Sequence, residues 1–259
     1  MSFKCPILLI NLDRSTDRLA RCQQLLSDAG VEFERISAVD GGQLSEQQLE
    51  QYAPKALADD LYYRRLTPGE IGCYLSHRKA WQIMVERQYP YAIILEDDFE
   101  VSGDISQTIA HIGRLDKSSE DWFFLKLACD DKRLKSIRYR RPLGEMTLAT
   151  FSKQSSGTSA QAVSLKGAKR LLKHSQTFAR PIDIDLQHWW EKGIQIMGLM
   201  PFAFRAGGYW DSQISAMANR SDQPQNRMRR ALLLLSAKLQ GWHETRKFIV
   251  EQQERNTKF

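Results

Sequence analysis

Three consecutive carboxylates follow a short apolar run and could hold a cation. The run from Tyr91 reads as a buried strand, because apolar and β-branched residues lead directly into the acids. Side chains alternate across a strand, so we expect Glu96 and Asp98 to share one face and Asp97 to point to the other. Neighbouring carboxylates repel unless a cation lies nearby, and their oxygens suit Mg²⁺ or Mn²⁺. An acidic loop after a core strand is the alternative.

A second polar segment, 11–18, lies at the carboxyl end of the first expected strand and at the start of the next helix. Ligands bind at this end of the strands in open α/β sheets. Backbone N–H groups at a helix start attract anions, and Arg14 and Arg18 add charged donors for phosphate. A surface loop with a helix cap and a local Asp–Arg pair is the alternative interpretation.

The segment Thr67-Pro68-Gly69-Glu70 predicts the start of a helix, with a capping box and proline at the first helical position. Glu70, Cys73 and His77 then share one helical face. His77 could bind a ligand hydroxyl, or it could be a structural residue of the core. Glu70 could do no more than complete its capping box.

Two later segments could also contact a ligand. The small, hydroxylated residues 155–160 precede an apolar strand and allow a ligand to approach the backbone closely, although a polar turn would look the same. Asp183 and Asp185 form a second acidic pair, and one of them could act as a general base. Acids favoured by the dipole of a helix N-terminus are the competing explanation.

Strands alternate with helices along the 259 residues, which predicts an α/β fold with a mainly parallel sheet. Residues 130–154 are basic and irregular, and they predict a hairpin or a mobile loop. Strands are expected at 5–11, 33–39, from 91 to the acids, 122–128, 157–164 and 194–204, and helices at 16–30, 45–52, 67–88, 105–115 and 166–174.

Charge and hydropathy divide the chain at about residue 222. Eight basic residues and three acids from residue 227 onward account for +5 of the net charge of +6. The body at 1–222 is therefore nearly neutral, which argues against nucleic-acid binding. No run approaches a membrane span, the apolar run near the start is too short for a secretion signal, and the four cysteines are scattered. We expect a cytoplasmic protein.

The tail at 223–259 carries an apolar stripe flanked by basic residues, which predicts an amphipathic helix. The stripe could lie on an anionic membrane, or it could pack on the body or on a second subunit. Gly241 argues against one continuous helix. The stripe comprises Met228, Leu232, Leu235, Leu239, Trp242 and Ile249.

Taken together, six segments resemble glycosyltransferase family 25, which includes bacterial lipooligosaccharide galactosyltransferases and collagen-modifying relatives. Their joint order along residues 9–186 is more specific than any one of them. In chain order they read INLDRSTDR, RISAVDG, GEIGCYLSHRKAW, IILEDDFE, SSGTSAQAVSLKGAKRLL and PIDIDL.

This resemblance implies a GT-A-like fold and an inverting, metal-dependent transfer of a sugar. The usual donor is UDP-galactose and the acceptor a sugar hydroxyl of a lipid-linked oligosaccharide, although family members differ in both. The acids resemble the DxD motif of these enzymes, so Asp98, helped by Glu96 or Asp97, would hold Mn²⁺ or Mg²⁺. The same resemblance places Asn11, Asp13, Arg14, Ala38, Asp40 and Asp97 at the donor, and Glu70, Ser76, His77, Gly157 and Thr158 at the donor or the acceptor.

The base that accepts the acceptor's proton would be Asp183 or Asp185, and burial would raise its pKa toward neutrality. The third metal ligand stays open, with His188 as a weak candidate. Two other classes of protein are alternatives to a glycosyltransferase. A nucleotidyltransferase could also place paired acids after a strand, and a non-catalytic glycolipid-binding module would turn over no nucleotide sugar.

Overall fold

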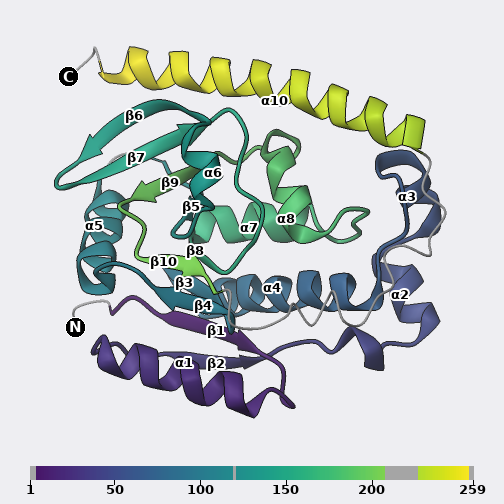
Figure 1. Ribbon diagram of the computed structural model, residues 1–259, viewed down its shortest axis with the longest axis horizontal. Coiled ribbons are helices and arrows are strands. Elements are labelled where there is room, and N and C mark those ends of the chain that lie inside the picture. The colour runs from purple at the N-terminus through teal and green to yellow at the C-terminus, as the bar shows by residue number, and fades with distance from the viewer. Residues whose placement is uncertain (1–3, 119–120, 208–226, 257–259) are drawn as a thin grey trace.

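A computed structural model describes residues 4–118, 121–207 and 227–256 of the chain (Figure 1). Within these residues eight strands form one sheet, in the order β2-β1-β3-β8-β5-β9-β7-β6. The strands are β1 (Ile7–Asn11), β2 (Glu34–Ser37), β3 (Tyr91–Glu96), β5 (Phe124–Lys126), β6 (Ile137–Leu143), β7 (Met146–Phe151), β8 (Ala160–Ser164) and β9 (Ile196–Met200). Two further short strands, β4 (Phe99–Val101) and β10 (Phe204–Ala206), pair with each other.

The sheet is mixed, with a parallel block at its amino-terminal side. β1 pairs in parallel with β2 and β3, and β5 pairs in parallel with β9. β8 runs antiparallel between β3 and β5, and the hairpin β6–β7 adds to β9 in antiparallel register. The result is an α/β fold consistent with a GT-A-like glycosyltransferase, as the sequence predicts. Every residue of β1 and β8 is buried, which explains the apolar run Ile7–Ile10 in β1.

Helices cover the sheet and frame its carboxyl edge. The long helix α4 (Pro68–Glu86) begins with the predicted capping box and packs against α7 (Leu165–Lys173), with Tyr74 and Trp81 in the core. The helices before α10 are α1 (Thr16–Asp28), η1 (Gly41–Gln43), α2 (Glu46–Tyr52), α3 (Lys55–Leu61), α4 (Pro68–Glu86), α5 (Ile105–Lys117), α6 (Asp131–Leu134), α7 (Leu165–Lys173), α8 (Ile182–Asp185) and η2 (Leu186–Lys192).

Two expectations about the elements change, and for residues 130–154 the hairpin alternative is confirmed. The helix α3 was not predicted, because its apolar residues lack a clear period between two prolines. Residues 130–154 contain α6 and the ordered hairpin β6–β7. The expected strand at 194–204 divides into β9 and β10, because the chain leaves the main sheet at Pro201 and pairs with β4.

The tail forms one helix, α10 (Arg227–Asn256), along the side of the molecule opposite α1 (Figure 1). Phe248, on the face of α10 toward the body, is buried against Trp189, and Thr245 donates a hydrogen bond to the Phe151 carbonyl at 3.5 Å. The argument from Gly241 against a continuous helix is wrong. A Cβ at Gly241 would lie 3.1 Å from the Trp190 ring, so glycine lets that ring pack against the helix. None of the described helices combines the length and the apolar character that crossing a membrane requires.

Candidate active site

A cavity of about 240 Å³ lies at the carboxyl ends of β1 and β3, the edge where open α/β sheets bind ligands. The turn into α1, the segment around η1, one face of α4 and the acids after β3 surround it. Its lining includes Asn11, Leu12, Arg14, Arg18, Ala38, Val39, Asp40, Cys73, Ser76, His77, Glu96, Asp97, Asp98 and Gly207. Nine of the residues predicted from the sequence are in this set.

Asp97 is held by hydrogen bonds from the first strand and the first helix. Asn11 Nδ2 donates to Asp97 Oδ2 at 2.8 Å, and Arg18 Nη1 donates to Asp97 Oδ1 at 3.0 Å. Asn11 is itself buried and accepts a hydrogen bond from Arg35 at 3.0 Å. Both carboxylate oxygens of Asp97 therefore have protein donors, and they fix the start of α1 against the end of β3.

Glu96 is bonded to the opposite side of the cavity. His77 Nε2 lies 2.7 Å from Glu96 Oε1, and Thr158 Oγ1 donates to the same oxygen. The Gln161 amide nitrogen lies 2.9 Å from His77 Nδ1, so Nδ1 accepts and Nε2 carries the hydrogen that faces Glu96. Burial raises the pKa of Glu96, but these hydrogen bonds and the Lys126 charge outweigh burial and lower it. Glu96 is thus held as a carboxylate.

Asp98 differs from both neighbours, because its Oδ1 is buried without a hydrogen-bond partner among the described residues. Burial raises its pKa to about 7, and the negative charges of Glu96 and Asp97 act in the same direction. A bound cation would offset the repulsion between this buried oxygen and the two neighbouring carboxylates. The carboxylate set therefore fits a hard divalent ion with Asp98 as the primary ligand.

The predicted faces of the three acids need a correction. Strand β3 ends at Glu96, and Asp97 and Asp98 form a turn before β4, so strand alternation does not apply to them. All three line the cavity. Potential ligand atoms of Cys73, His77 and Glu96 also lie within 4.8 Å of one another, although the His77 ring nitrogens are already engaged by Gln161 and Glu96.

The residues expected near the nucleotide divide into two groups. Arg14 forms an ion pair with Asp40, and both line the cavity together with Ala38. Asp13 points elsewhere: it accepts hydrogen bonds from Arg35 and Ser37, its side chain is 72% exposed, and the described lining omits it. The strand β2 supplies both partners, which spacing within the motif could not reveal.

Two residues of α4 that were expected at a ligand have hydrogen-bond partners within the fold. Glu70 is buried, completes the capping box and accepts two hydrogen bonds from Arg64, at 2.8 Å and 2.6 Å. It lies outside the described lining of the cavity. Ser76 does line it, but its hydroxyl donates to the Gly72 carbonyl at 2.7 Å and accepts from the Val39 N–H at 2.8 Å. Ser76 thereby ties α4 to the segment beside η1.

The two candidate bases occupy different surroundings. Asp185 is buried among Tyr74, Lys192 at 2.9 Å and Arg180 at 3.5 Å, so its carboxylate is fully engaged within the fold. Asp183 lines a second cavity, and burial raises its pKa, opposed by the Lys126 charge and by hydrogen bonds from backbone N–H groups. The position of Asp183 suits a base, whereas that of Asp185 suits a structural ion pair.

Lys126 was missed by sequence reasoning. It lies at the carboxyl end of β5, is buried, and donates a hydrogen bond to the Gly157 carbonyl. Burial lowers its pKa to about 8, against the opposing effect of Asp183 and Glu96. The sequence feature that could have identified Lys126 is its position near the carboxyl end of the strand expected at 122–128. Gly157 has a φ of +85°, which favours glycine there.

His188 lies away from the carboxylates. It lines a separate cavity between the body and α10, and its Nδ1 lies 3.0 Å from the Ile184 carbonyl. This position gives no support to His188 as a third ligand beside Asp98.

Comparison with known proteins identifies the family. The model of glycosyltransferase family 25 (LPS biosynthesis protein) matches residues 4–186. The chain belongs to glycosyltransferase family 25. The match covers β1 through α8 and so contains both cavities' acids, from Asp40 to Asp183.

Animal proteins are among the relatives. A glycosyltransferase 25 family member of Drosophila melanogaster is 31% identical over 180 residues, covering 68% of this chain and 28% of the fly protein. Procollagen galactosyltransferase 1-A of Xenopus laevis is 31% identical over 191 residues, covering 71% and 30%. Procollagen galactosyltransferase 2 of Mus musculus is 28% identical over 183 residues, covering 69% and 29%. The chain matches less than a third of the length of each of these relatives.

Proposed function

We propose that this protein transfers galactose from UDP-galactose to a hydroxyl of an acceptor sugar, with inversion at the anomeric carbon and with Mn²⁺ or Mg²⁺ bound. One observation carries the proposal: Asp98, whose buried Oδ1 has no hydrogen-bond partner among the described residues, lines a cavity that Arg14 and Arg18 also line. A diphosphate needs both a cation and anion-binding groups. The names of the relatives support galactose as the sugar.

Different residues of the chain would contact the uridine, the diphosphate and the cation. Ala38 and Asp40 would contact the uridine end, and the α1 start with Arg14 would bind the diphosphate. Asp98 would hold the cation beside the diphosphate, while Asn11 and Arg18 keep Asp97 in place. When bound, the ion neutralises negative charge that builds on the departing UDP.

Asp183 is the proposed base. Inversion requires a carboxylate that accepts the acceptor's proton as the hydroxyl attacks. The pKa of Asp183 is raised by burial, which makes its carboxylate a stronger base near neutral pH than an exposed aspartate.

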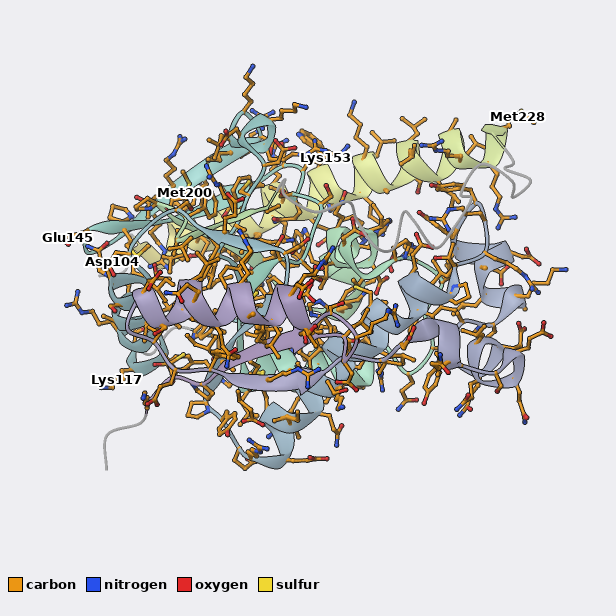
Figure 2. All side chains as sticks on the ribbon, turned by 60° about the horizontal axis from the view of Figure 1, so that its bottom comes forward. Asp104, Lys117, Glu145, Lys153, Met200 and Met228 are labelled. Atoms are coloured by element: carbon orange, nitrogen blue, oxygen red, sulfur yellow. The ribbon has the colours of Figure 1, made fainter. Side chains whose placement is uncertain are left out.

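The acceptor is proposed to be a sugar of a lipid-linked oligosaccharide, at the cytoplasmic face of a membrane. The family's description as LPS biosynthesis proteins supports this class of acceptor. The outer face of α10 supports a membrane location, because five apolar side chains there are 54% to 77% exposed. Exposed basic side chains, among them Arg230, Lys238 and Arg246, lie on the same helix and would favour anionic lipid. The exposed apolar residues are Met228, Leu232, Leu235, Leu239 and Trp242; Met228 is labelled at one extremity of the molecule in Figure 2.

A panel of UDP-sugars tests the proposal. Each sugar is incubated with the full chain and Mn²⁺, and the release of UDP and of pyrophosphate is measured. We expect UDP release to be fastest with UDP-galactose. Pyrophosphate release would indicate a nucleotidyltransferase instead. Glycolipid binding without release of UDP from any sugar would indicate a binding module.

A further inference from the structure

One carboxylate oxygen in the first cavity lies close to a thiol and to an imidazole. Glu96 Oε1 is 2.7 Å from His77 Nε2 and 3.9 Å from Cys73 Sγ. The ligand atoms of these three residues lie within 4.8 Å of one another, and all three residues line the cavity. Cys73 and His77 stand at i and i+4 on α4, so helix geometry places both side chains at the end of β3. A sulfur, a nitrogen and an oxygen therefore converge on one point.

This set of atoms suits a different class of ion from the one expected at Asp98. Thiolate and imidazole ligands favour zinc and similar ions, whereas Mg²⁺ and Mn²⁺ favour oxygen ligands alone. Zinc often has three protein ligands, with water or a substrate in the fourth position, and its ligand atoms lie about 3–4 Å apart. The two contacts of Glu96 Oε1, at 2.7 Å and 3.9 Å, are close to that spacing. Because the three residues line the cavity, water can reach the fourth position.

Gln161 can support the form of His77 that a metal ion needs. Its side chain is fully buried, its amide nitrogen lies 2.9 Å from His77 Nδ1, and its Oε1 has no hydrogen-bond partner among the described residues. A half-turn of the amide would place Oε1 at Nδ1, where it accepts the ring hydrogen and leaves the Nε2 lone pair for an ion. One amide atom bonds to His77 in either orientation, so the contact is kept.

We infer that Cys73, His77 and Glu96 form a second metal site, which binds a thiophilic divalent ion such as Zn²⁺, apart from the hard ion at Asp98. On binding, the ion forms bonds to Sγ, Nε2 and Oε1 and replaces the hydrogens that Cys73 and His77 direct at Glu96. The thiol proton leaves to solvent, and the imidazole keeps one hydrogen, which now lies on Nδ1. The inference does not depend on which sugar the protein transfers.

Cobalt absorbance tests the inference. Co²⁺ accepts the same thiolate and imidazole ligands as Zn²⁺, and a thiolate bound to Co²⁺ gives a near-ultraviolet charge-transfer band that oxygen ligands do not give. Co²⁺ is titrated into the full chain in excess Mg²⁺, which competes for sites made of oxygen alone, and Zn²⁺ is then added. Cys73→Ser is the test variant. Cys129→Ser is the matched control, since Cys129 is equally partly buried but lines the second cavity.

We expect the wild type to show the band and Zn²⁺ to remove it. Cys73→Ser should lack the band, whereas Cys129→Ser and Asp98→Asn should keep it. No band in the wild type would overturn the inference, as would a band in Cys73→Ser or its loss in Cys129→Ser. Loss of the band in Asp98→Asn would show a single shared site, which also contradicts the inference.

A measurement on the wild type alone assigns the ligand without relying on the folding of a variant. Alkylation of the cysteines by iodoacetamide is followed by mass spectrometry, with and without Zn²⁺ in excess Mg²⁺. A metal-bound thiolate is a poor nucleophile, so Zn²⁺ should slow the alkylation of Cys73 by at least about tenfold and leave that of Cys129 unchanged. Equal alkylation of Cys73 with and without Zn²⁺ would overturn the inference.

Discussion

Asp98 differs from its two acidic neighbours in the partners of its oxygens. Asp97 receives hydrogen bonds from Asn11 and Arg18, and Glu96 from His77 and Thr158. These hydrogen bonds occupy both oxygens of Asp97, and those to Glu96 help to lower its pKa without a metal. Asp98 has repulsive charges nearby and a pKa of about 7, so its ionised form gains most from a bound cation.

The pH dependence of metal binding follows from that pKa. The Asp98 carboxyl must lose its proton before its oxygens can coordinate an ion, so protons compete with the metal below about pH 7. We expect the Mn²⁺ affinity, measured by calorimetry without nucleotide, to fall toward ~10-fold per pH unit below that value and to level off above it. Asp98→Asn should abolish this dependence. An affinity that is constant between about pH 5 and 8 would contradict the assignment.

The two downstream acids should respond differently to substitution. Asp183→Ala should leave UDP binding near normal and slow transfer by ~10²–10⁴-fold. Because the pKa of Asp183 is raised, the wild-type rate should fall, as pH decreases, at a higher pH than an ordinary aspartate would give. Asp185→Ala should lower the free energy of unfolding by roughly 3–5 kcal/mol, because it leaves Lys192 buried without its carboxylate.

Denaturant unfolding and single-turnover kinetics would separate these effects. Wild-type transfer by Asp183→Ala would place the base elsewhere. Wild-type stability of Asp185→Ala would contradict the structural role of its ion pairs.

At the residue scale, sequence spacing located the acids but not their partners. The motif around Asn11 indicated a ligand site, and Asn11 and Arg14 do line the cavity. Asp13 turns away because β2 brings Arg35 and Ser37 beside it. Such contacts depend on which strands become neighbours, and a local motif does not encode that.

At the element scale, two glycines hold α4 against η1. A Cβ on Gly72 would lie 2.6 Å from both the Val39 carbonyl oxygen and the Gly41 nitrogen. This close approach brings Ala38 and Asp40 into the lining of the first cavity together with Cys73 and His77 of α4.

Gly72→Ala should therefore force backbone atoms apart and lower stability by about 1–3 kcal/mol. The matched control is Gly42→Ala, where the added Cβ would meet the Asp40 side chain at an ordinary 3.4 Å. Thermal unfolding of both variants checks the prediction. A Gly72→Ala protein as stable as Gly42→Ala would show that the two segments can separate freely.

The tail helix α10 has two faces with different roles. Phe248, on its inner face, is buried against Trp189 of the body, so this face packs on the body as one of the two alternatives for the tail predicts. The outer face keeps most of the predicted stripe exposed, while Ile249 is partly buried. Truncation would disturb both faces, so substitutions on the outer face give the cleaner test.

Leu235→Glu with Leu239→Glu should weaken sedimentation with anionic vesicles by at least about tenfold, because two exposed apolar side chains no longer enter the lipid. Unfolding should not change. Ala20→Glu with Gln23→Glu adds the same charges to α1, on the opposite side of the molecule, and should bind vesicles like the wild type. Absence of vesicle binding by the wild type at low salt would overturn the membrane proposal.

Elements with strong local signals were predictable, such as α4 with its capping box. The hairpin β6–β7 was left open because its strand β6 alternates polar and partly buried residues and depends on pairing with β7. The continuity of α10 through Gly241 depends on the packing of Trp190, which lies far away in the sequence.

At the scale of the whole molecule, the order of the sheet brings distant segments to one edge. β3 lies between β1 and β8, so the acids at its end meet both the α1 start and the 157–159 segment. The chain's first hundred residues build most of the first cavity, and later segments build the second. An α/β fold with a mainly parallel sheet was predicted from the alternating pattern, whereas the antiparallel insertion of β8 was not, because periodicity carries no strand direction.

The turnover of Asp98→Asn tests the central claim most directly. UDP release from UDP-galactose in Mn²⁺ is compared for the wild type, Asp98→Asn and the control Asp59→Asn, an exposed acid of α3 outside the cavities. We expect Asp59→Asn to match the wild type. Asp98→Asn should release UDP at least about 100-fold more slowly, because the cation beside the diphosphate loses its main ligand. Wild-type rates for Asp98→Asn, together with full activity of the wild type in EDTA, would contradict the account.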